Sequence, residues 1–349
     1  MNKYHLIIIA SLFNLSTMAN AETLIKMIAL HQSSTCIIDA QNKLFCWGKN
    51  SRKLESKSSP EDKPTAINIF PQTVKVFLDS IYSCAISIDG SAKCWGMVPN
   101  KLGSTHGQNK NTVKSINTPS PVKDMSIGWD LGCFLTINGE VWCWGKLSSK
   151  SGYDDPVKMT LPLKAEQIST ETSEACALLS DGSVWCWGGM WQESPTKLLE
   201  VNEPVQQIIN GHWRLDDTLC AVTREKKFKC WFQNRAIKDR TFQPIEGLED
   251  LLIVAHNKFY GCAIINNGKV KCWGQSIPHG HGILGQGSEI TASKSALSVE
   301  GVQGAVSLIL EDDIACALLK DGKVKCWGAG FKILGNNHNT FQLPYELKL

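Results

Sequence analysis

Short apolar segments recur seven times along the chain, and each is followed by a stretch in which apolar and polar residues alternate. The alternating stretch surrounds an Asp-Gly or Asn-Gly pair in its best-preserved copies, which begin at Cys176 and Cys316 and read Cys-Ala-Leu-Leu-x-Asp-Gly-x-Val-x-Cys-Trp-Gly. Alternation with a period of two is typical of β-strands, and Asp-Gly between two such runs indicates a hairpin. Each repeat is therefore predicted to form four strands. The apolar segment forms the first strand, the hairpin forms the second and third, and a fourth lies in the longer stretch after Cys-Trp-Gly. The predicted first strands are Leu24–Leu30, Val74–Leu78, Val122–Ile127, Ala165–Ser169, Val205–Ile209, Leu251–Ala255 and Ala305–Leu310.

The 14 cysteines form seven pairs, and the two members of each pair lie ten residues apart: Cys36 and Cys46, Cys84 and Cys94, Cys133 and Cys143, Cys176 and Cys186, Cys220 and Cys230, Cys262 and Cys272, and Cys316 and Cys326. A two-residue hairpin loop would place paired cysteines on opposite sheet faces, whereas the three-residue loop Ser180-Asp181-Gly182 places Cys176 opposite Cys186. The third loop residue then adopts the left-handed conformation, and it is glycine in five repeats, Asn42 in the first and Lys226 in the fifth. Each cysteine pair falls on a non-hydrogen-bonded position, where Cβ atoms approach closely enough for a disulfide. We therefore expect one disulfide per hairpin. Zinc is the alternative, but no Cys-x₂₋₄-Cys motif is present and we predict no metal.

The repeat length predicts the architecture. Successive first cysteines lie 48, 49, 43, 44, 42 and 54 residues apart by subtraction of their numbers, a spacing typical of propeller blades. We predict an all-β fold: a seven-bladed β-propeller with one intra-blade hairpin disulfide per repeat. A tryptophan follows the second cysteine in every repeat, and we expect it to pack between blades: Trp47, Trp95, Trp144, Trp187, Trp231, Trp273 and Trp327.

The N-terminal segment predicts export. Lys3, the apolar run Leu6–Phe13 and the small-x-small motif Ala19-Asn20-Ala21 are typical of a secretory signal peptide. We predict a signal peptide at residues 1–21 and a single propeller domain at residues 22–349, located in the periplasm or outside the cell. Disulfides suit such an oxidising compartment. The net charge of +3 and the absence of a Lys/Arg run disfavour nucleic-acid binding. We expect a monomer with no membrane span and no cofactor.

The repeated Cys-Ala-Leu-Leu-x-Asp-Gly-x-Val-x-Cys-Trp-Gly core resembles the regulator of chromosome condensation repeat, in the disulfide-bearing form of secreted bacterial proteins. The resemblance covers residues 22–349 and implies a seven-bladed propeller, similar in architecture to a β-lactamase inhibitory protein. Three features depart from the family pattern. The Asn-x-x-Gly-Gln-Leu-Gly tail survives only in fragments such as Leu284-Gly285-Gln286, Phe232 replaces the glycine of the fifth Cys-Trp-Gly, and no histidine precedes the first cysteine of a repeat. The eukaryotic founder of the family acts on a nuclear GTPase and on chromatin, and the predicted export argues against both roles here.

The loops outside the repeat pattern carry the candidate binding residues. We find no G-x-S-x-G, phosphate-binding loop or H-E-x-x-H motif, and we predict a protein without a catalytic site. Up-and-down strands place the loops before the first cysteine and after Cys-Trp-Gly on one face, which holds the partner-binding candidates Trp129, Trp191, His212, Trp213 and Arg214. Loop packing is the alternative role for these tryptophans. His279 and His281 alone would make a weak metal site. We expect a protein partner, bound for inhibition or for interaction at a cell surface. A surface glycan is the alternative partner, and an enzyme is the third class.

Overall fold

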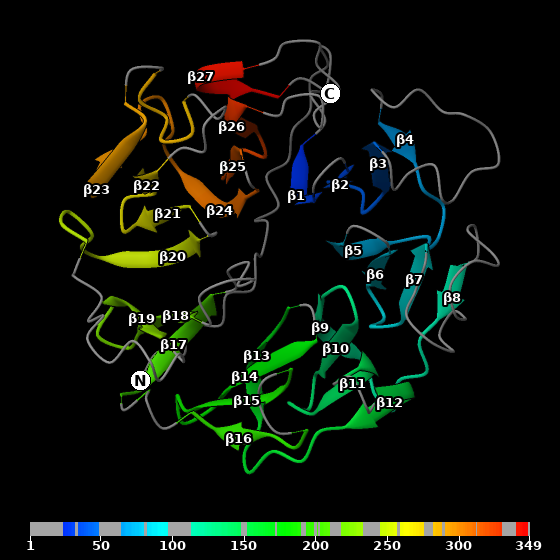
Figure 1. Cartoon of the computed structure of the whole chain (residues 1–349). Coiled ribbons are helices and arrows are strands. Elements are labelled where there is room, and N and C mark those ends of the chain that lie inside the picture. Colours follow the sequence, from blue (N-terminus) through cyan, green and yellow to red (C-terminus); the bar gives the residue numbers. More distant parts are fainter. Residues whose placement is uncertain are drawn as a thin grey trace.

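The computed structural model shows a ring of seven small β-sheets (Figure 1). It describes residues 24–31, 34–48, 64–79, 82–96, 113–147, 152–171, 173–189, 193–198, 201, 203–209, 218–232, 245–256, 259–275, 282–287, 290–311, 313–329 and 340–347, with the backbone alone at 152–154, 218–219, 230–232 and 340–342. The predicted signal peptide lies outside these residues. No helix in the described part of the chain is long and apolar enough to cross a membrane.

Each sheet, or blade, is built from consecutive strands. Blade 1 contains β1 (Ile25–His31), β2 (Ser34–Asp39), β3 (Leu44–Gly48) and β4 (Thr65–Ala66). Blade 2 contains β5 (Thr73–Leu78), β6 (Tyr82–Ser87), β7 (Ala92–Gly96) and β8 (Val113–Ser115), and blade 3 contains β9 (Val122–Ile127), β10 (Leu131–Thr136), β11 (Val141–Lys146) and β12 (Gly152–Lys158). Blade 4 contains β13 (Ala165–Thr170), β14 (Glu174–Leu179), β15 (Val184–Gly188) and β16 (Thr196–Lys197).

Blade 5 contains β17 (Val205–Ile209), β18 (Thr218–Thr223) and β19 (Phe228–Phe232), and its predicted fourth strand lies outside the described residues. Blade 6 contains β20 (Leu251–His256), β21 (Tyr260–Ile265), β22 (Val270–Gln275) and β23 (Ala292–Ser298). Blade 7 contains β24 (Ala305–Leu310), β25 (Ile314–Leu319), β26 (Val324–Ala329) and β27 (Thr340–Glu346). The first strand of every blade lies toward the centre of the ring (Figure 1). The seven-bladed propeller is confirmed, and every predicted first strand agrees with the structure to within one residue at each end.

The hairpins have the predicted three-residue loop. In blade 4, Gly182 N donates to Leu179 O (2.8 Å) and Leu179 N donates to Ser183 O (2.9 Å), which closes the loop at residues 180–182. All seven residues in the predicted left-handed slot have positive φ: Asn42, Gly90, Gly139, Gly182, Lys226, Gly268 and Gly322.

The loops bring the paired cysteines opposite each other in every blade. Six disulfides have Cα atoms 4.0–4.1 Å apart and agree with the predicted pairing: Cys36 with Cys46, Cys84 with Cys94, Cys133 with Cys143, Cys176 with Cys186, Cys262 with Cys272, and Cys316 with Cys326. In blade 5, Cys220 is also disulfide-bonded and faces Cys230, whose side chain lies outside the described residues. The prediction of one disulfide per hairpin is thus confirmed for six blades, and the seventh pair has the same register.

The core of the protein lies between the blades. The described residues form seven apolar clusters, and each cluster joins two neighbouring blades around the ring. In the cluster between blades 3 and 4, Trp187 of blade 4 is fully buried against Leu131 and Cys133 of blade 3. The predicted packing role is confirmed for the six repeat tryptophans with described side chains: Trp47, Trp95, Trp144, Trp187, Trp273 and Trp327. The side chain of Trp231 lies outside the described residues.

Backbone hydrogen bonds tie six of the seven hairpins to the following blade. At the junction that closes the ring, Ile25 N of blade 1 donates to Gly322 O of blade 7 (3.0 Å), and Ile25 shares an apolar cluster with Leu318 and Leu347. Five other junctions have the equivalent bond, made by Thr73, Val122, Ala165, Val205 and Ala305. Among the described residues, only the junction between blades 5 and 6 lacks it. There the Gln207 side chain donates to Val254 O (3.0 Å) and accepts from Val254 N (3.3 Å).

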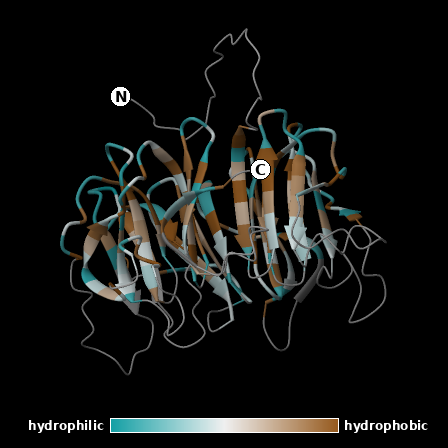
Figure 2. Cartoon of the chain, turned by 90° about the horizontal axis from the view of Figure 1, so that it is seen from above, coloured by the Kyte–Doolittle hydropathy of each residue, from teal (hydrophilic) through white to brown (hydrophobic). Residues whose placement is uncertain are grey.

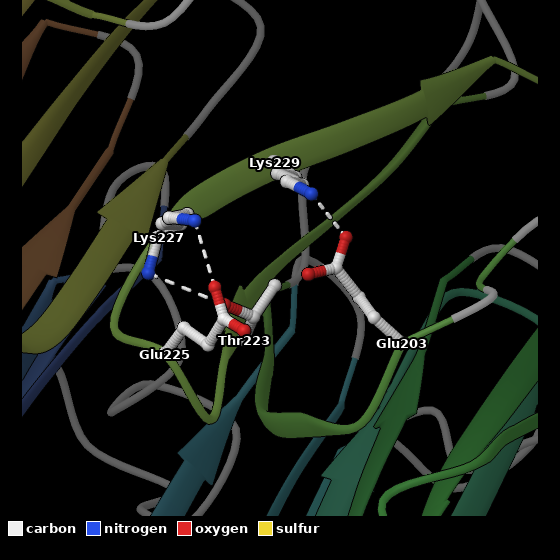
Figure 3. A network of polar contacts seen from close by, with 5 residues as sticks. All are labelled: Glu203, Thr223, Glu225, Lys227 and Lys229. Atoms are coloured by element: carbon white, nitrogen blue, oxygen red, sulfur yellow. Dashed lines mark hydrogen bonds and ion pairs between the residues drawn. The ribbon is translucent and has the colours of Figure 1, made fainter.

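The blade 5 hairpin also replaces the usual turn contacts (Figure 3). In blade 4 the Asp181 carboxylate accepts from Ser183 N (2.9 Å) and so fixes the turn. In blade 5 Glu225 stands in its place and forms an ion pair with the Lys227 side chain (2.7 Å), while Lys227 N donates to the Thr223 hydroxyl (3.3 Å). The longer glutamate thus pairs with a side chain, while the backbone bonds that close the loop, from Lys226 N to Thr223 O (2.9 Å) and from Thr223 N to Lys227 O (2.9 Å), are those of the other hairpins.

Candidate functional site

The strands run between two faces of the ring, which differ in the segments that form them. We call the face with the connections between first and second strands the loop face; its described residues include Asp79, 128–130, Glu171, Phe259 and Glu311. The opposite face, formed by the hairpin tips, is the turn face. Figure 2 shows hydrophobic residues concentrated along the strands and hydrophilic residues in the described turns. The loops of the loop face therefore connect strands that are rich in apolar residues.

The glycine of Cys-Trp-Gly anchors the loop between the first and second strands in four blades. Gly145 has a φ of +98°, and a Cβ atom there would lie 2.1 Å from Asp130 O. The loop can approach so closely only because residue 145 has no side chain, and Lys146 N then donates to Asp130 O (2.7 Å). The same close approach occurs between Gly188 and Ser173 O, Gly274 and Phe259 O, and Gly328 and Asp313 O. Four loops are thus pinned to the third strand of their own blade.

Neighbouring loops also brace one another. The hydroxyl of Tyr82 in blade 2 donates to Gly128 O in blade 3 (3.0 Å), and Gly128 packs directly against Glu171 O of blade 4. Burial first, and then the nearby carboxylates of Asp79 and Asp130, raise the pKa of Tyr82 well above its usual value. The phenol is therefore neutral and remains a hydrogen-bond donor. Across the ring, the Tyr260 hydroxyl donates to Glu311 O (2.7 Å) and Ile314 O (2.8 Å).

Of the five predicted partner-binding residues, Trp129 alone lies in the described part of the chain. It lies at the tip of the braced loop of blade 3, and 45% of its surface is exposed. The partly exposed carboxylate residues Asp130 and Glu171 come from this loop and from the corresponding loop of blade 4, and Glu174 is the first residue of β14. Just over half of the Trp129 surface is buried, so the indole packs partly against the protein and exposes the rest to solvent. A preorganised loop that presents a large aromatic surface beside carboxylates can bind a partner by stacking and by charge-assisted hydrogen bonds.

The remaining predicted binding residues, Trp191, His212, Trp213 and Arg214, lie outside the described residues, as do His279 and His281. The structure therefore does not place them relative to Trp129. Within the described part of the chain, no group of three or more His, Cys, Asp or Glu residues could hold a metal ion.

Three lysines have a structural role that the sequence analysis missed. Lys93, Lys271 and Lys325 occupy the position before the second cysteine of their repeats, and each ammonium donates to a backbone carbonyl 24 residues earlier, at Ile69 (3.1 Å), Gly247 (2.6 Å) and Gly301 (2.6 Å). Each of these lysines holds the segment that leads into the first strand of its own blade. The constant separation of 24 residues between the lysine and the carbonyl is a signal from which the sequence analysis could have predicted this hydrogen bond.

The fold and the hairpin motif define the chain as a disulfide-stapled seven-bladed β-propeller. Residues 122–150, which include most of blade 3, match the model of the regulator of chromosome condensation (RCC1) repeat. The resemblance to this repeat family is therefore confirmed. No curated protein sequence matches the chain.

Solved propellers with low sequence identity share the fold. Prp20p from Saccharomyces cerevisiae has 16% identity and a TM-score of 0.69, covering 94% of this chain and 88% of its own. Yeast RCC1 (Prp20) in its complex with Kap60 has 14% identity and a TM-score of 0.69, covering 99% and 91%. The ectodomain of the Arabidopsis thaliana receptor kinase ACR4 has 19% identity and a TM-score of 0.56, covering 88% and 96%. At these identities the comparisons establish the architecture alone.

Proposed function

We propose that the protein is an exported, non-catalytic binding protein that captures a protein partner on its loop face. Trp129 is the described anchor, and Trp191, His212, Trp213 and Arg214 complete the proposed site. The exposed indole of Trp129 on a braced loop carries the proposal, because rigid aromatic anchors dominate the binding energy of protein interfaces. Such an interface could inhibit the partner or hold it at a cell surface.

Two further observations support a binding role. Prp20p, which shares the fold, has been studied for its binding to Gsp1p and histones, and yeast RCC1 has been crystallised with Kap60. The loop face is also preorganised, since its described loops are pinned to their own blades and braced against neighbours. Preorganisation lowers the entropy lost on binding. Export is supported by the disulfides, whose described cysteines lie in the core between the blades.

Capture of the partner tests the proposal. The mature protein, immobilised and cross-linked to its natural surroundings, should retain a specific protein identified by mass spectrometry. Trp129→Ala should weaken binding of that protein by about 30-fold or more, the effect expected for a hot-spot residue of at least 2 kcal/mol, without changing thermal stability. Leu343→Ala, at an exposed position on the outer strand β27, is the matched control and should bind normally. Unchanged capture by Trp129→Ala would refute the proposed site.

A glycan is the second candidate partner, because an exposed indole next to a carboxylate also suits stacking on a sugar ring with hydrogen bonds to its hydroxyls. Trp129 and Asp130 provide that pair. A glycan array probed with the mature protein and with Trp129→Ala separates the two candidates. Binding to a defined sugar that requires Trp129 would favour the glycan over the protein partner.

A further inference from the structure

The hairpin tips that form the turn face carry exposed aliphatic residues in two neighbouring blades only. Ile88 and Ile137 are the first loop residues of the hairpins in blades 2 and 3, and they are 63% and 60% exposed. The same loop position holds small or polar residues in the other blades: Ala40, Ser180, Arg224, Asn266 and Lys320. Pro121 is also exposed, and Leu163 is 45% exposed in the segment that enters blade 4.

These four residues follow one another across the turn face. Gly90, two residues after Ile88, is so close to Pro121 that a Cβ atom at Gly90 would lie 2.4 Å from Pro121 Cβ. Ile137 N donates to Pro121 O (3.0 Å). We call Ile88, Pro121, Ile137 and Leu163 the apolar stripe.

A close contact at a glycine also connects Ile137 to Leu163, the last residue of the stripe. Gly139, two residues after Ile137, packs against Lys164, the neighbour of Leu163 in sequence. Exposed apolar residues on a monomer are usually scattered singly, so four that follow one another across one face are a candidate contact surface.

Opposite charges mark the two ends of the stripe. Asp89 follows Ile88 at one end, where hydrogen bonds from the backbone and hydroxyl of Ser91, and from the Ser87 hydroxyl, lower the pKa of its carboxyl to about 2. Lys164 follows Leu163 at the other end and is exposed. The Glu140 carboxylate beside Ile137 forms an ion pair within its own blade, with Lys158 (2.5 Å). A surface complementary to the stripe is apolar opposite Ile88, Pro121, Ile137 and Leu163, positive opposite Asp89 and negative opposite Lys164, and it must also accommodate the exposed Lys123 next to Val122.

A second copy of this chain has that pattern. We propose that two copies associate through their apolar stripes about a two-fold axis that runs along a radius of the ring between Pro121 and Ile137. Rotation about this axis places one stripe against the other with the order of the residues reversed. Ile88 then faces Leu163 of the partner subunit, and Asp89 faces Lys164 of the partner subunit, with both contacts repeated on the other side of the axis. The contact is isologous and closes at two copies. The proposed dimer differs from the monomer expected from the sequence, and it leaves both loop faces open because it uses the opposite face.

Sedimentation equilibrium of the mature protein tests the dimer. At neutral pH and moderate salt, the mass should rise from monomer to dimer over about 1–100 µM, the range of a small interface. Ile137→Asp places a charge in the middle of the stripe and should weaken association by about tenfold or more, and Leu163→Asp should do the same if the first variant folds poorly. Leu343→Asp, at an exposed position outside the stripe, is the control and should associate normally. A monomer throughout the concentration range, or a dimer unaffected by both stripe variants, would overturn the proposal.

Charge exchange tests the reversed arrangement of the two copies. Asp89→Lys alone and Lys164→Asp alone each bring like charges together twice and should weaken the dimer. The double variant restores opposite charges at both ends and should regain association relative to either single variant. A double variant no better than the singles would contradict the two-fold arrangement. Thermal melts of each variant identify any loss of folding at the turn.

Discussion

Replacing Gly145 by alanine should destabilise the loop that presents Trp129. Gly145 has a φ of +98°, where a residue with a side chain is strained by about 1–3 kcal/mol. The added Cβ would also lie 2.1 Å from Asp130 O, so the carbonyl must move away. That movement disrupts the hydrogen bond from Lys146 N, which contributes about 0.5–1.5 kcal/mol. We expect the free energy of unfolding to fall by about 2–4 kcal/mol in total, a large part of the stability of a typical domain.

A variant at a second glycine separates the cost of backbone strain from the cost of the clash with Asp130 O. Gly287 has a φ of +87°, but a Cβ atom there would meet nothing within 4 Å, so Gly287→Ala introduces only the backbone strain. Denaturant titration should show a larger loss for Gly145→Ala than for Gly287→Ala. Hydrogen exchange should accelerate at residues 128–131 in the first variant only. Equal losses, with unchanged exchange in the loop, would refute the idea that the glycine is needed for the close approach of Asp130.

Three further changes test the scaffold. Replacing Cys176 and Cys186 by serine opens a short covalent loop and should lower the free energy of unfolding by about 2–3 kcal/mol in a denaturant titration; an unchanged midpoint would contradict this. Gln207→Ala removes both hydrogen bonds to Val254 at the junction without a turn-to-strand bond, at a cost of about 1–3 kcal/mol, and hydrogen exchange should rise first in β17 and β20. Burial lowers the pKa of His256 to about 4, so between pH 6.5 and pH 4 the unfolded chain binds a proton that the folded chain does not. Stability should therefore fall by about 2 kcal/mol from neutral pH to pH 5, and His256→Gln should flatten this dependence in titrations at the two pH values.

The repeat made the scaffold predictable from the sequence. The ten-residue spacing of Cys176 and Cys186, together with a glycine at position 182, favours the three-residue hairpin loop over the two-residue loop, and the structure has the three-residue loop. The packing of Trp187 followed from its recurrence, because a side chain that occupies the same position in every blade must meet the same neighbour.

The surfaces were harder to predict. Ile88 and Pro121 are 33 residues apart by subtraction, and only the arrangement of blades around the ring brings their segments together. The apolar stripe therefore leaves no periodic signal in the sequence. Trp129 could be proposed from its departure from the repeat, and the structure describes it as exposed. Trp191 and Trp213 lie in segments without a repeated register, so no periodicity places their side chains, and their role stays a prediction.

Because the ring is closed between blades 7 and 1, the position of the chain ends around the ring can be changed. Blade 1 and blade 7 each consist of their own consecutive strands, and no strand is exchanged between them. Ile25 and Leu347, near the two ends of the described chain, share one apolar cluster. A polypeptide cut between blades 3 and 4 and joined across this cluster would keep every sheet and every disulfide intact. The architecture is thus compatible with circular permutation, since the order in which the blades are synthesised is separable from the order in which they stand around the axis.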